Sequence, residues 1–374
     1  METAEQLRSA EQGQDLFKIH GTHHVELYVG NAKQAAYYYR RALGFRITGY
    51  LGPETGVKDR ASYLVEQGKI RFVLTTPLHP DSPIAAHIHE HGDGVRDIAL
   101  HVENAEEAYR ITTERGARGV MEPVETSDHF GTIKTATIAT YGDTVHSFIE
   151  RGSYNGFFLP NFEPREDNLS TPCGLKHVDH IVGNVDWNKM EETVNFYANV
   201  FGFTRFVSFD DKDISTEYSA LRSTVVANEN KWVKFPINEP AAGLKRSQIE
   251  EYVNFYKGAG VQHIAMESEN ILETIAKMRA NGVEFINVPH SYYDELAKRM
   301  GEISESIEEL KALNILVDFD DKGYMLQIFT KPVEDRPTLF FEIIQRRGGE
   351  SFGKGNFKAL FEAIERDQAA RGNL

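Results

Sequence analysis

Three polar residues in apolar surroundings, His180, His263 and Glu342, have the side-chain types of a metal-binding set. Each belongs to a short apolar segment typical of a buried β-strand, and the three segments lie far apart in the chain. Two imidazoles and one carboxylate from different strands are the ligands of the 2-His-1-carboxylate triad, which leaves one face of a ferrous ion open for substrate and dioxygen. Any one of them alone would more often be a hydrogen-bonded core residue, so the set needs further support.

An internal repeat supplies that support. The segment GAGVQHIAMESEN, beginning at Gly258, is identical at seven of thirteen positions to GDGVRDIALHVEN, beginning at Gly92. Matching the repeats aligns the candidate ligands with residues of the first half: His180 with His24, His263 with Asp97, and Glu342 with Ser147. Because only the second half combines all three donors, the sequence predicts that the metal site lies there.

The strand that carries Glu342 places its carboxylate among apolar side chains. Along Leu339–Arg346, a period of two puts Phe340, Glu342 and Ile344 on one face. An unpaired buried carboxylate is very costly, so Glu342 needs a cation or hydrogen-bond donors beside it.

The repeat also indicates the fold. Four copies of one plan, a strand, a helix and then several strands, begin near residues 21, 92, 175 and 258. Two of the expected helices lie near Ala105–Arg115 and Ile271–Asn281, and each is followed by a glycine suited to a helix C-terminus. We therefore expect an α+β protein with one domain over 1–155, a linker over 156–173 and a second domain over 174–374.

Two helical stretches are additions to the second half. Asp294–Ile315 is predicted to be a helical insertion in the last copy. Another helix is expected to begin at Asn356, a good N-cap residue, and to present an apolar face with i, i+3, i+4, i+7 spacing. The residues of that face are Phe357, Leu360, Phe361 and Ile364. This terminal helix must cover a hydrophobic surface.

Composition argues against several classes of function. Lys and Arg total 41 and Asp and Glu 56, a net charge of −15, and no basic block could neutralise phosphates, so nucleic acid and anionic membranes are not expected partners. A single cysteine, Cys173, excludes an internal disulfide. Neither a secretory signal nor a run of about 20 apolar residues is found. We therefore predict a cytoplasmic protein.

A second group of histidines, His87, His89 and His91 in the segment HIHEHGDG, has the alternate spacing that can chelate a metal ion. Its polar surroundings favour a solvated loop or the start of a helix instead. We do not expect a metal site there.

Five longer segments resemble the 4-hydroxyphenylpyruvate dioxygenase family of the vicinal oxygen chelate superfamily: VDHIVGNV, FPINEP, KRSQIEEYVNFYKGAGVQHIA, LQIFTKPVEDRPTLFFEIIQR and GKGNF. The resemblance covers nearly the whole chain and is densest from Gly174 to Leu374. It implies a two-domain vicinal oxygen chelate fold, in which four βαβββ modules form two open barrel-like sheets and a C-terminal helix gates the second domain. The first domain would be non-catalytic, and exposed sheet edges would favour a homo-oligomer, a dimer or tetramer.

The same resemblance assigns roles to residues. It implies that His180, His263 and Glu342 bind Fe(II), in agreement with the repeat. The substrate pocket would be lined by Ser223, Pro236, Asn238, Gln248, Gln262, Gln327, Phe329, Phe340, Asn356 and Phe357. Catalytic roles would fall to Ser223, Asn238, Gln262, Gln327 and Phe357. The implied reaction of 4-hydroxyphenylpyruvate with O2 gives homogentisate and CO2 by oxidative decarboxylation, ring hydroxylation and side-chain migration, a step of tyrosine catabolism.

Three other functions stay open from the sequence. A 4-hydroxymandelate synthase would hydroxylate the side chain of the same substrate, but Phe357, where that activity has a smaller aliphatic residue, and the intact PINEP segment favour the ring. An extradiol ring-cleaving dioxygenase would consume catechols without releasing CO2. In a metal-free binding or structural protein, both halves would have the fold of the first half and would lack the metal-binding set.

Overall fold

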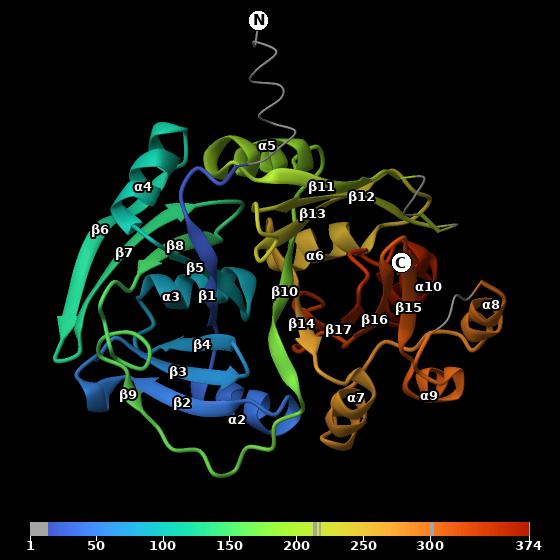
Figure 1. Ribbon diagram of the computed structural model, residues 1–374, viewed down its shortest axis with the longest axis horizontal. Coiled ribbons are helices and arrows are strands. Elements are labelled where there is room, and N and C mark those ends of the chain that lie inside the picture. The colour runs from blue at the N-terminus through green and yellow to red at the C-terminus, as the bar shows by residue number, and fades with distance from the viewer. Residues whose placement is uncertain (1–13, 212–214, 217, 300–302, 374) are drawn as a thin grey trace, which may run out of the picture.

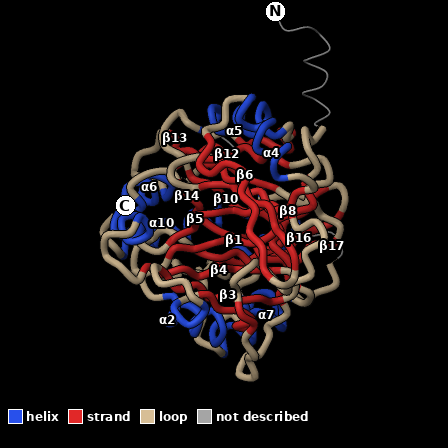
Figure 2. The backbone as a smooth tube through the Cα atoms, turned by 90° about the vertical axis from the view of Figure 1, so that its left-hand side faces the viewer, coloured by secondary structure: helices blue, strands red, loops and turns tan. Residues whose placement is uncertain are grey.

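The computed structural model describes residues 14–373 except 212–214, 217 and 300–302. Two curled sheets lie side by side, one built from each half of the chain (Figure 1). The first sheet has nine strands in the order β6-β7-β8-β5-β1-β4-β3-β2-β9, and the second has eight in the order β11-β12-β13-β10-β14-β17-β16-β15. From the side, the strands form the centre and the helices lie around the outside (Figure 2).

The strands of the first sheet are β1 (Ile19–Tyr28), β2 (Arg46–Leu51), β3 (Arg60–Gln67), β4 (Ile70–Pro77), β5 (Gly94–Val102), β6 (Gly119–Asp128), β7 (Gly131–Ala139), β8 (Val145–Glu150) and β9 (Glu163–Pro164). Those of the second are β10 (Leu175–Asn184), β11 (Thr204–Phe209), β12 (Ala220–Ala227), β13 (Lys234–Ala241), β14 (Gly260–Ser268), β15 (Leu316–Asp320), β16 (Gly323–Phe329) and β17 (Phe340–Arg347). The α-helices are α2 (Ala32–Ala42), α3 (Pro83–His91), α4 (Ala105–Glu114), α5 (Met190–Phe201), α6 (Gln248–Tyr256), α7 (Ile271–Ala280), α8 (Ser291–Arg299), α9 (Ile307–Leu313) and α10 (Phe357–Ala370). Two short 3-10 turns, η1 (Pro53–Thr55) and η2 (Lys354–Asn356), complete the elements.

Each half contains two βαβββ modules, so the fold predicted from the repeat is confirmed. In every module the first strand pairs in parallel with the last: β1 with β4, β5 with β8, β10 with β13, and β14 with β17. The first strands of the two modules in one half pair antiparallel at the centre of the sheet, β1 with β5 and β10 with β14. The register agrees with the matched repeats, because Ala99 lies opposite His24 as Ala265 lies opposite His180.

Local sequence signals position α4 and α7 where they were predicted. Asn104 and Asn270 cap the two N-termini, each accepting a hydrogen bond from the backbone N–H three residues on, at 2.8 and 3.4 Å. Gly116 and Gly282 follow the last turns with φ values of 102° and 91°, a region that favours glycine. The sequence analysis did not identify α3 and α6, which precede β5 and β14.

The predicted insertion is two helices, α8 and α9, rather than one continuous stretch. Residues 300–302 between them lie outside the described part of the chain. Ser306 is the N-cap residue of α9, and its hydroxyl accepts a hydrogen bond from the N–H of Glu309 at 3.4 Å. No described helix is long and apolar enough to cross a lipid bilayer.

The terminal helix α10 begins at Phe357, as expected, but the predicted side-chain cap is wrong. Asn356 has helical backbone angles and makes no capping hydrogen bond to the helix. Its Oδ1 instead accepts a hydrogen bond from the hydroxyl of Tyr292 at 2.7 Å. The hydrogen bond from Tyr292 of the insertion therefore replaces the capping hydrogen bond that the sequence predicted for the Asn356 side chain.

The segment 156–173 packs closely against the first half. Its strand β9 pairs with β2, and the ring of Phe158 is fully buried. At its end, the side-chain oxygen of Gln67 accepts hydrogen bonds from the backbone N–H groups of Cys173, Gly174 and Leu175, at 2.8, 2.9 and 3.1 Å. The Gln67 side-chain nitrogen donates to the carbonyl of Leu43 at 2.9 Å. One buried amide thus fixes the point where the chain enters the second half.

Replacing Gln67 by leucine should therefore be costly. A buried donor or acceptor without a partner costs about 1–3 kcal/mol, and this change orphans three N–H groups and one carbonyl, so we expect Gln67→Leu to lower the free energy of unfolding by about 4 kcal/mol or more. Urea unfolding measures it. The matched control is Gln34→Leu on the exposed side of α2, which should stay within about 0.5 kcal/mol of the original chain. Equal losses in the two variants would contradict this account.

Candidate metal centre

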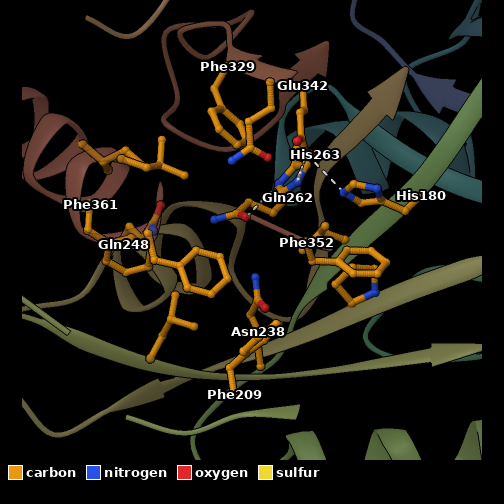
Figure 3. A pocket seen from close by; sticks show the side chains of 18 of the residues that line it. His180, Phe209, Asn238, Gln248, Gln262, His263, Phe329, Glu342, Phe352 and Phe361 are labelled. Carbon is orange, nitrogen blue, oxygen red and sulfur yellow. Dashed lines mark hydrogen bonds and ion pairs between the residues drawn. The ribbon is translucent and has the colours of Figure 1, made fainter. Parts of the chain in front are cut away.

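Three adjacent strands bring the predicted ligands together. His180 lies on β10, His263 on β14 and Glu342 on β17 (Figure 3). His180 and Glu342 both lie opposite Ala265 of β14, one on each side, and His263 is two residues before Ala265 on the same strand. All three side chains therefore share one face of the sheet. The small Ala265 between them leaves room for their polar atoms to converge.

The three polar side chains are buried and close together. Exposed fractions are 5%, 9% and 3% for His180, His263 and Glu342. Glu342 Oε2 lies 3.1 Å from His180 Nε2 and 3.3 Å from His263 Nε2. Their ligand atoms all lie within 4.8 Å of one another. Neutral imidazole and carboxylate donors at this spacing could hold a metal ion with further positions left for other ligands.

A β-bulge next to each histidine supplies the group that orients it. The register of β10 against β14 shifts between Val178 and His180 and again between Val182 and Gly183, which leaves Asp179 and Gln262 without opposite partners. Asp179 Oδ1 accepts a hydrogen bond from His180 Nδ1 at 2.8 Å. Gln262 Oε1 accepts one from His263 Nδ1 at 3.0 Å. Both Nε2 atoms are thereby left to face Glu342.

Asp179 in turn sits in a buried ion network that the sequence analysis missed. Arg346 donates to both of its oxygens, from Nε at 2.8 Å and from Nη2 at 3.0 Å, and Lys234 Nζ lies 3.2 Å from Oδ2. Burial alone would raise the pKa of Asp179, but the hydrogen bonds from His180 and Arg346 hold it well below its usual range. The only sequence signal for this role was its position beside His180.

The protonation states of Glu342 and His263 suit metal binding directly. Burial would raise the pKa of Glu342, but the attraction and hydrogen bonds of His180 and then His263 lower it to about 2. Burial lowers the pKa of His263, which outweighs the opposing effect of Glu342. At neutral pH the carboxylate is therefore ionised and the His263 ring is neutral, the forms in which both side chains bind a cation. Burial would lower the pKa of His180, but the charge of Glu342 and the hydrogen bond to Asp179 raise it, so a cation bound there replaces a proton.

A cavity opens directly from these three residues. Nine of the ten side chains predicted to line a substrate pocket are on its wall: Ser223, Pro236, Asn238, Gln248, Gln262, Gln327, Phe329, Phe340 and Phe357. Asn356 is the exception, because its side chain is fully buried and bonded to Tyr292.

The apolar face of α10 forms one wall of this cavity. Its four residues, Phe357, Leu360, Phe361 and Ile364, all line it, so the cavity is the hydrophobic surface that the terminal helix was expected to cover. Of the four, the sequence analysis assigned only Phe357 to the pocket. Further lining residues that it did not assign are Val182, Phe209, Leu221, Val225 and Phe352. The period of two could have identified Val182, which follows His180 by two positions on β10.

The first half keeps the fold of this centre but only one of its three donors, His24. Asp97 takes the place of His263, and its Oδ1 accepts a hydrogen bond from the backbone N–H of Ser147, the residue matched to Glu342, at 2.9 Å. Phe158 fills the corresponding space, because it packs on Leu64 and Val73 of β3 and β4. In the second half the matched strands β12 and β13 border the cavity.

Comparisons with known proteins agree with this geometry. Models of the Glyoxalase/Bleomycin resistance protein/Dioxygenase superfamily match residues 23–134 and 177–338. A protein from Yarrowia lipolytica named 4-hydroxyphenylpyruvate dioxygenase is 49% identical over 98% of this chain and 96% of its own length. Proteins of the same name from Dictyostelium discoideum (48% identical; 95% of this chain, 100% of theirs) and Xenopus tropicalis (49%; 94% and 92%) are also similar.

One solved structure has the same architecture. A mutant of 4-hydroxymandelate synthase from Streptomyces coelicolor superposes with a TM-score of 0.85 and 29% sequence identity, over 94% of this chain and 99% of its own. This chain thus shares its fold, over nearly its whole length, with proteins named 4-hydroxyphenylpyruvate dioxygenase or 4-hydroxymandelate synthase.

The buried Asp97 generates a prediction about stability and pH. Burial raises its pKa to about 7, despite the hydrogen bonds from Ser147. Because the unfolded carboxyl ionises near pH 4, stability is lost as the pH rises from about 4 to 7, by about 1.4 kcal/mol for each pH unit in that window. Asp97→Asn keeps the acceptor for Ser147 and removes the charge. We expect urea unfolding to show Asp97→Asn gaining stability over the original chain between pH 5 and pH 8.

The exposed Asp59 provides the control. Asp59→Asn should show no such change with pH, because its side chain is 61% exposed. A difference between Asp97→Asn and the original chain that stays constant from pH 5 to pH 8 would refute the assignment.

Proposed function

The chain belongs to the 4-hydroxyphenylpyruvate dioxygenase family, and on that premise we propose that it converts 4-hydroxyphenylpyruvate and O2 to homogentisate and CO2 with ferrous iron as cofactor. The observation that carries the proposal is the convergence of His180, His263 and Glu342 at one end of a cavity whose other walls are aromatic, aliphatic and amide side chains.

The donor set fits ferrous iron. Two neutral imidazoles and one carboxylate are the protein ligands of non-haem Fe(II) oxygenases, and the shared face of the three strands leaves the cavity side open. When bound, the iron supplies the activation of dioxygen and the positions at which a 2-oxo acid can chelate. No second 2-oxo acid is required, because the substrate carries its own.

The apolar wall holds the aromatic ring. Phe329 of β16 and Phe357 of α10 both line the cavity, and we assign them to the two faces of the substrate ring. The His263 ring stacks on Phe340 with a centroid distance of 4.8 Å and an interplanar angle of 22°. Phe340 therefore also fixes the orientation of His263, one of the proposed metal ligands. These contacts position the substrate and exclude water from the reacting atoms.

Amide side chains orient the polar ends of the substrate. Asn238, Gln248 and Gln327 reach the cavity from β13, α6 and β16, and Ser223 lies opposite Asn238 on β12. We propose that these groups hydrogen-bond the phenol and the carboxylate. Gln262 has a further task, because its oxygen also fixes the tautomer of His263.

The helix α10 is the proposed gate. Two buried acidic side chains hold it closed: Glu365 accepts a hydrogen bond from Ser219 at 2.6 Å, and Arg371 pairs with Glu251 of α6 at 2.8 Å. Since α10 supplies one wall of the cavity, we propose that its movement admits the substrate and its return excludes water. The first half, whose corresponding space is filled by Phe158, then serves as a non-catalytic scaffold.

Identification of the aromatic product tests the function. Anaerobic protein is mixed with Fe(II) and 4-hydroxyphenylpyruvate, oxygen is added, and the product is analysed. We expect homogentisate and one CO2 per turnover. 4-Hydroxymandelate as the product would replace the proposal by its nearest alternative, and the absence of both products would refute it.

Alanine substitution at matched positions of the two halves tests the ligands. His180→Ala and His263→Ala should each reduce turnover to background and lower the iron content of the purified protein, because two of three ligands cannot hold the open geometry. The matched control is His24→Ala, at the position of His180 in the first half, which should keep both iron and turnover. Retained turnover in His180→Ala would contradict the assignment.

We also propose that the chain is cytoplasmic and forms a dimer or tetramer. Light scattering after size-exclusion chromatography measures the mass in solution, and a mass near 42.3 kDa would contradict self-association.

A further inference from the structure

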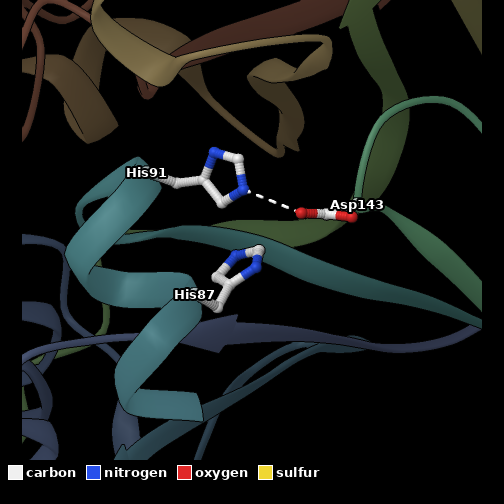
Figure 4. Close-up of side chains that lie close together, drawn as sticks. All are labelled: His87, His91 and Asp143. Atoms are coloured by element: carbon white, nitrogen blue, oxygen red, sulfur yellow. Dashed lines mark hydrogen bonds and ion pairs between the residues drawn. The ribbon is translucent and has the colours of Figure 1, made fainter. Parts of the chain in front are cut away.

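A second group of donors lies where the two halves meet, away from the cavity. His87 and His91 are four residues apart on α3, and Asp143 is in the turn between β7 and β8 (Figure 4). Their ligand atoms lie within 4.8 Å of one another, and the two imidazole centroids are 4.5 Å apart. The sequence analysis expected a solvated loop or the start of a helix here. The three histidines lie instead towards the C-terminal end of α3, where His87 and His91 are buried and His89 is exposed.

The hydrogen bonds of His91 leave two acceptors facing each other. Its Nδ1 is 2.5 Å from the backbone carbonyl of Tyr256, which can only accept, so Nδ1 carries a proton and donates it. Its Nε2 lies 3.0 Å from Asp143 Oδ2, and an ionised carboxylate is also only an acceptor. Either a second proton or a cation must lie between Nε2 and Oδ2. An imidazole that donates Nδ1–H to a backbone carbonyl is the usual orientation of a metal-bound histidine.

His87 provides an independent indication. Its Nε2 is buried and has no hydrogen-bond partner among the described residues. Such a group costs free energy unless something binds it.

The turn that carries Asp143 is held firmly beside α3. Gly142 has a φ of +56°, and a Cβ atom there would collide with the backbone carbonyl of Ala259 in the second half. Arg96 donates a hydrogen bond to the backbone carbonyl of Asp143. The His91 ring also stacks on Tyr256, with centroids 4.4 Å apart. The cluster is therefore preorganised, and both halves of the chain shape it.

We propose that His87, His91 and Asp143 bind a divalent cation of the zinc class at the seam between the two halves, where α3 and the β7–β8 turn contact Tyr256 and Ala259. Two imidazoles and one carboxylate, with water as the fourth ligand, form a common tetrahedral set for Zn²⁺. A bound ion would give His87 Nε2 a partner and would lie between His91 Nε2 and the Asp143 carboxylate. It would also link α3 to the β7–β8 turn, at the place where His91 contacts Tyr256 of the second half. None of the three residues lines the cavity, so this site is separate from the proposed iron centre.

Zn²⁺ titration of the chelator-treated full-length chain tests the site. Isothermal titration calorimetry counts the ions bound by the original chain, Asp143→Asn and His87→Ala. We expect both variants to lose one equivalent, or to bind it at least about tenfold more weakly, and we expect Zn²⁺ to raise their melting temperatures less. Asp143→Asn is the safer variant for folding, because the Asp143 side chain is 60% exposed and Asn keeps its size.

Two controls make the result specific. His89→Ala, on the exposed side of the same helix, should bind Zn²⁺ as the original chain does. Glu342→Ala should lose a different equivalent and retain the one that depends on Asp143, so this proposal and the proposed function can fail separately. If the original chain and Asp143→Asn bind the same number of Zn²⁺ ions with the same affinity, a proton bridges His91 and Asp143 and the metal site is refuted.

Discussion

The negative charge of Glu342 is buried and must be compensated, and the metal centre of the second half depends on this constraint. A carboxylate that is 3% exposed among apolar strands would be prohibitive alone, and two imidazoles within 3.3 Å make it possible. The pairing of β10, β14 and β17 brings these groups to one level of the sheet. An arrangement that concentrates ionised and neutral donors in this way is well suited to a divalent cation, whose charge would complete the compensation.

The same sheet tolerates the loss of this centre, as the first half demonstrates. Asp97 and Ser147 occupy two of the three matched positions and hydrogen-bond to each other, and Phe158 takes the space of the cavity. The architecture of four modules is therefore maintained by strand pairing and by the apolar core, not by the metal ligands. Function in this fold is a local addition to one of two similar halves.

Orientation of the ligands depends on a layer of groups behind them. Two β-bulges turn Asp179 and Gln262 toward the histidines that follow them, and Arg346 and Lys234 balance the charge of Asp179. The seam between the halves shows a similar principle, because a backbone carbonyl of the second half orients a histidine of the first. Directed hydrogen bonds thus fix which nitrogen of each ring is available.

The sequence by itself determined the four-module architecture, the candidate ligands and the apolar face of α10, because repeats and the periods of strands and helices are local patterns that survive without coordinates. The other residues predicted for the cavity wall came from the resemblance to a known family, not from these patterns. Only the tertiary structure decided which groups orient the ligands. A strict period of two puts Asp179 and Gln262 on the face opposite to their neighbouring histidines, and the bulges that reverse this arise from pairing between strands about 80 residues apart. Likewise, Asn356 lost its capping role to Tyr292, and His87 and His91 became buried because α3 packs at the seam, contacts that no local pattern records.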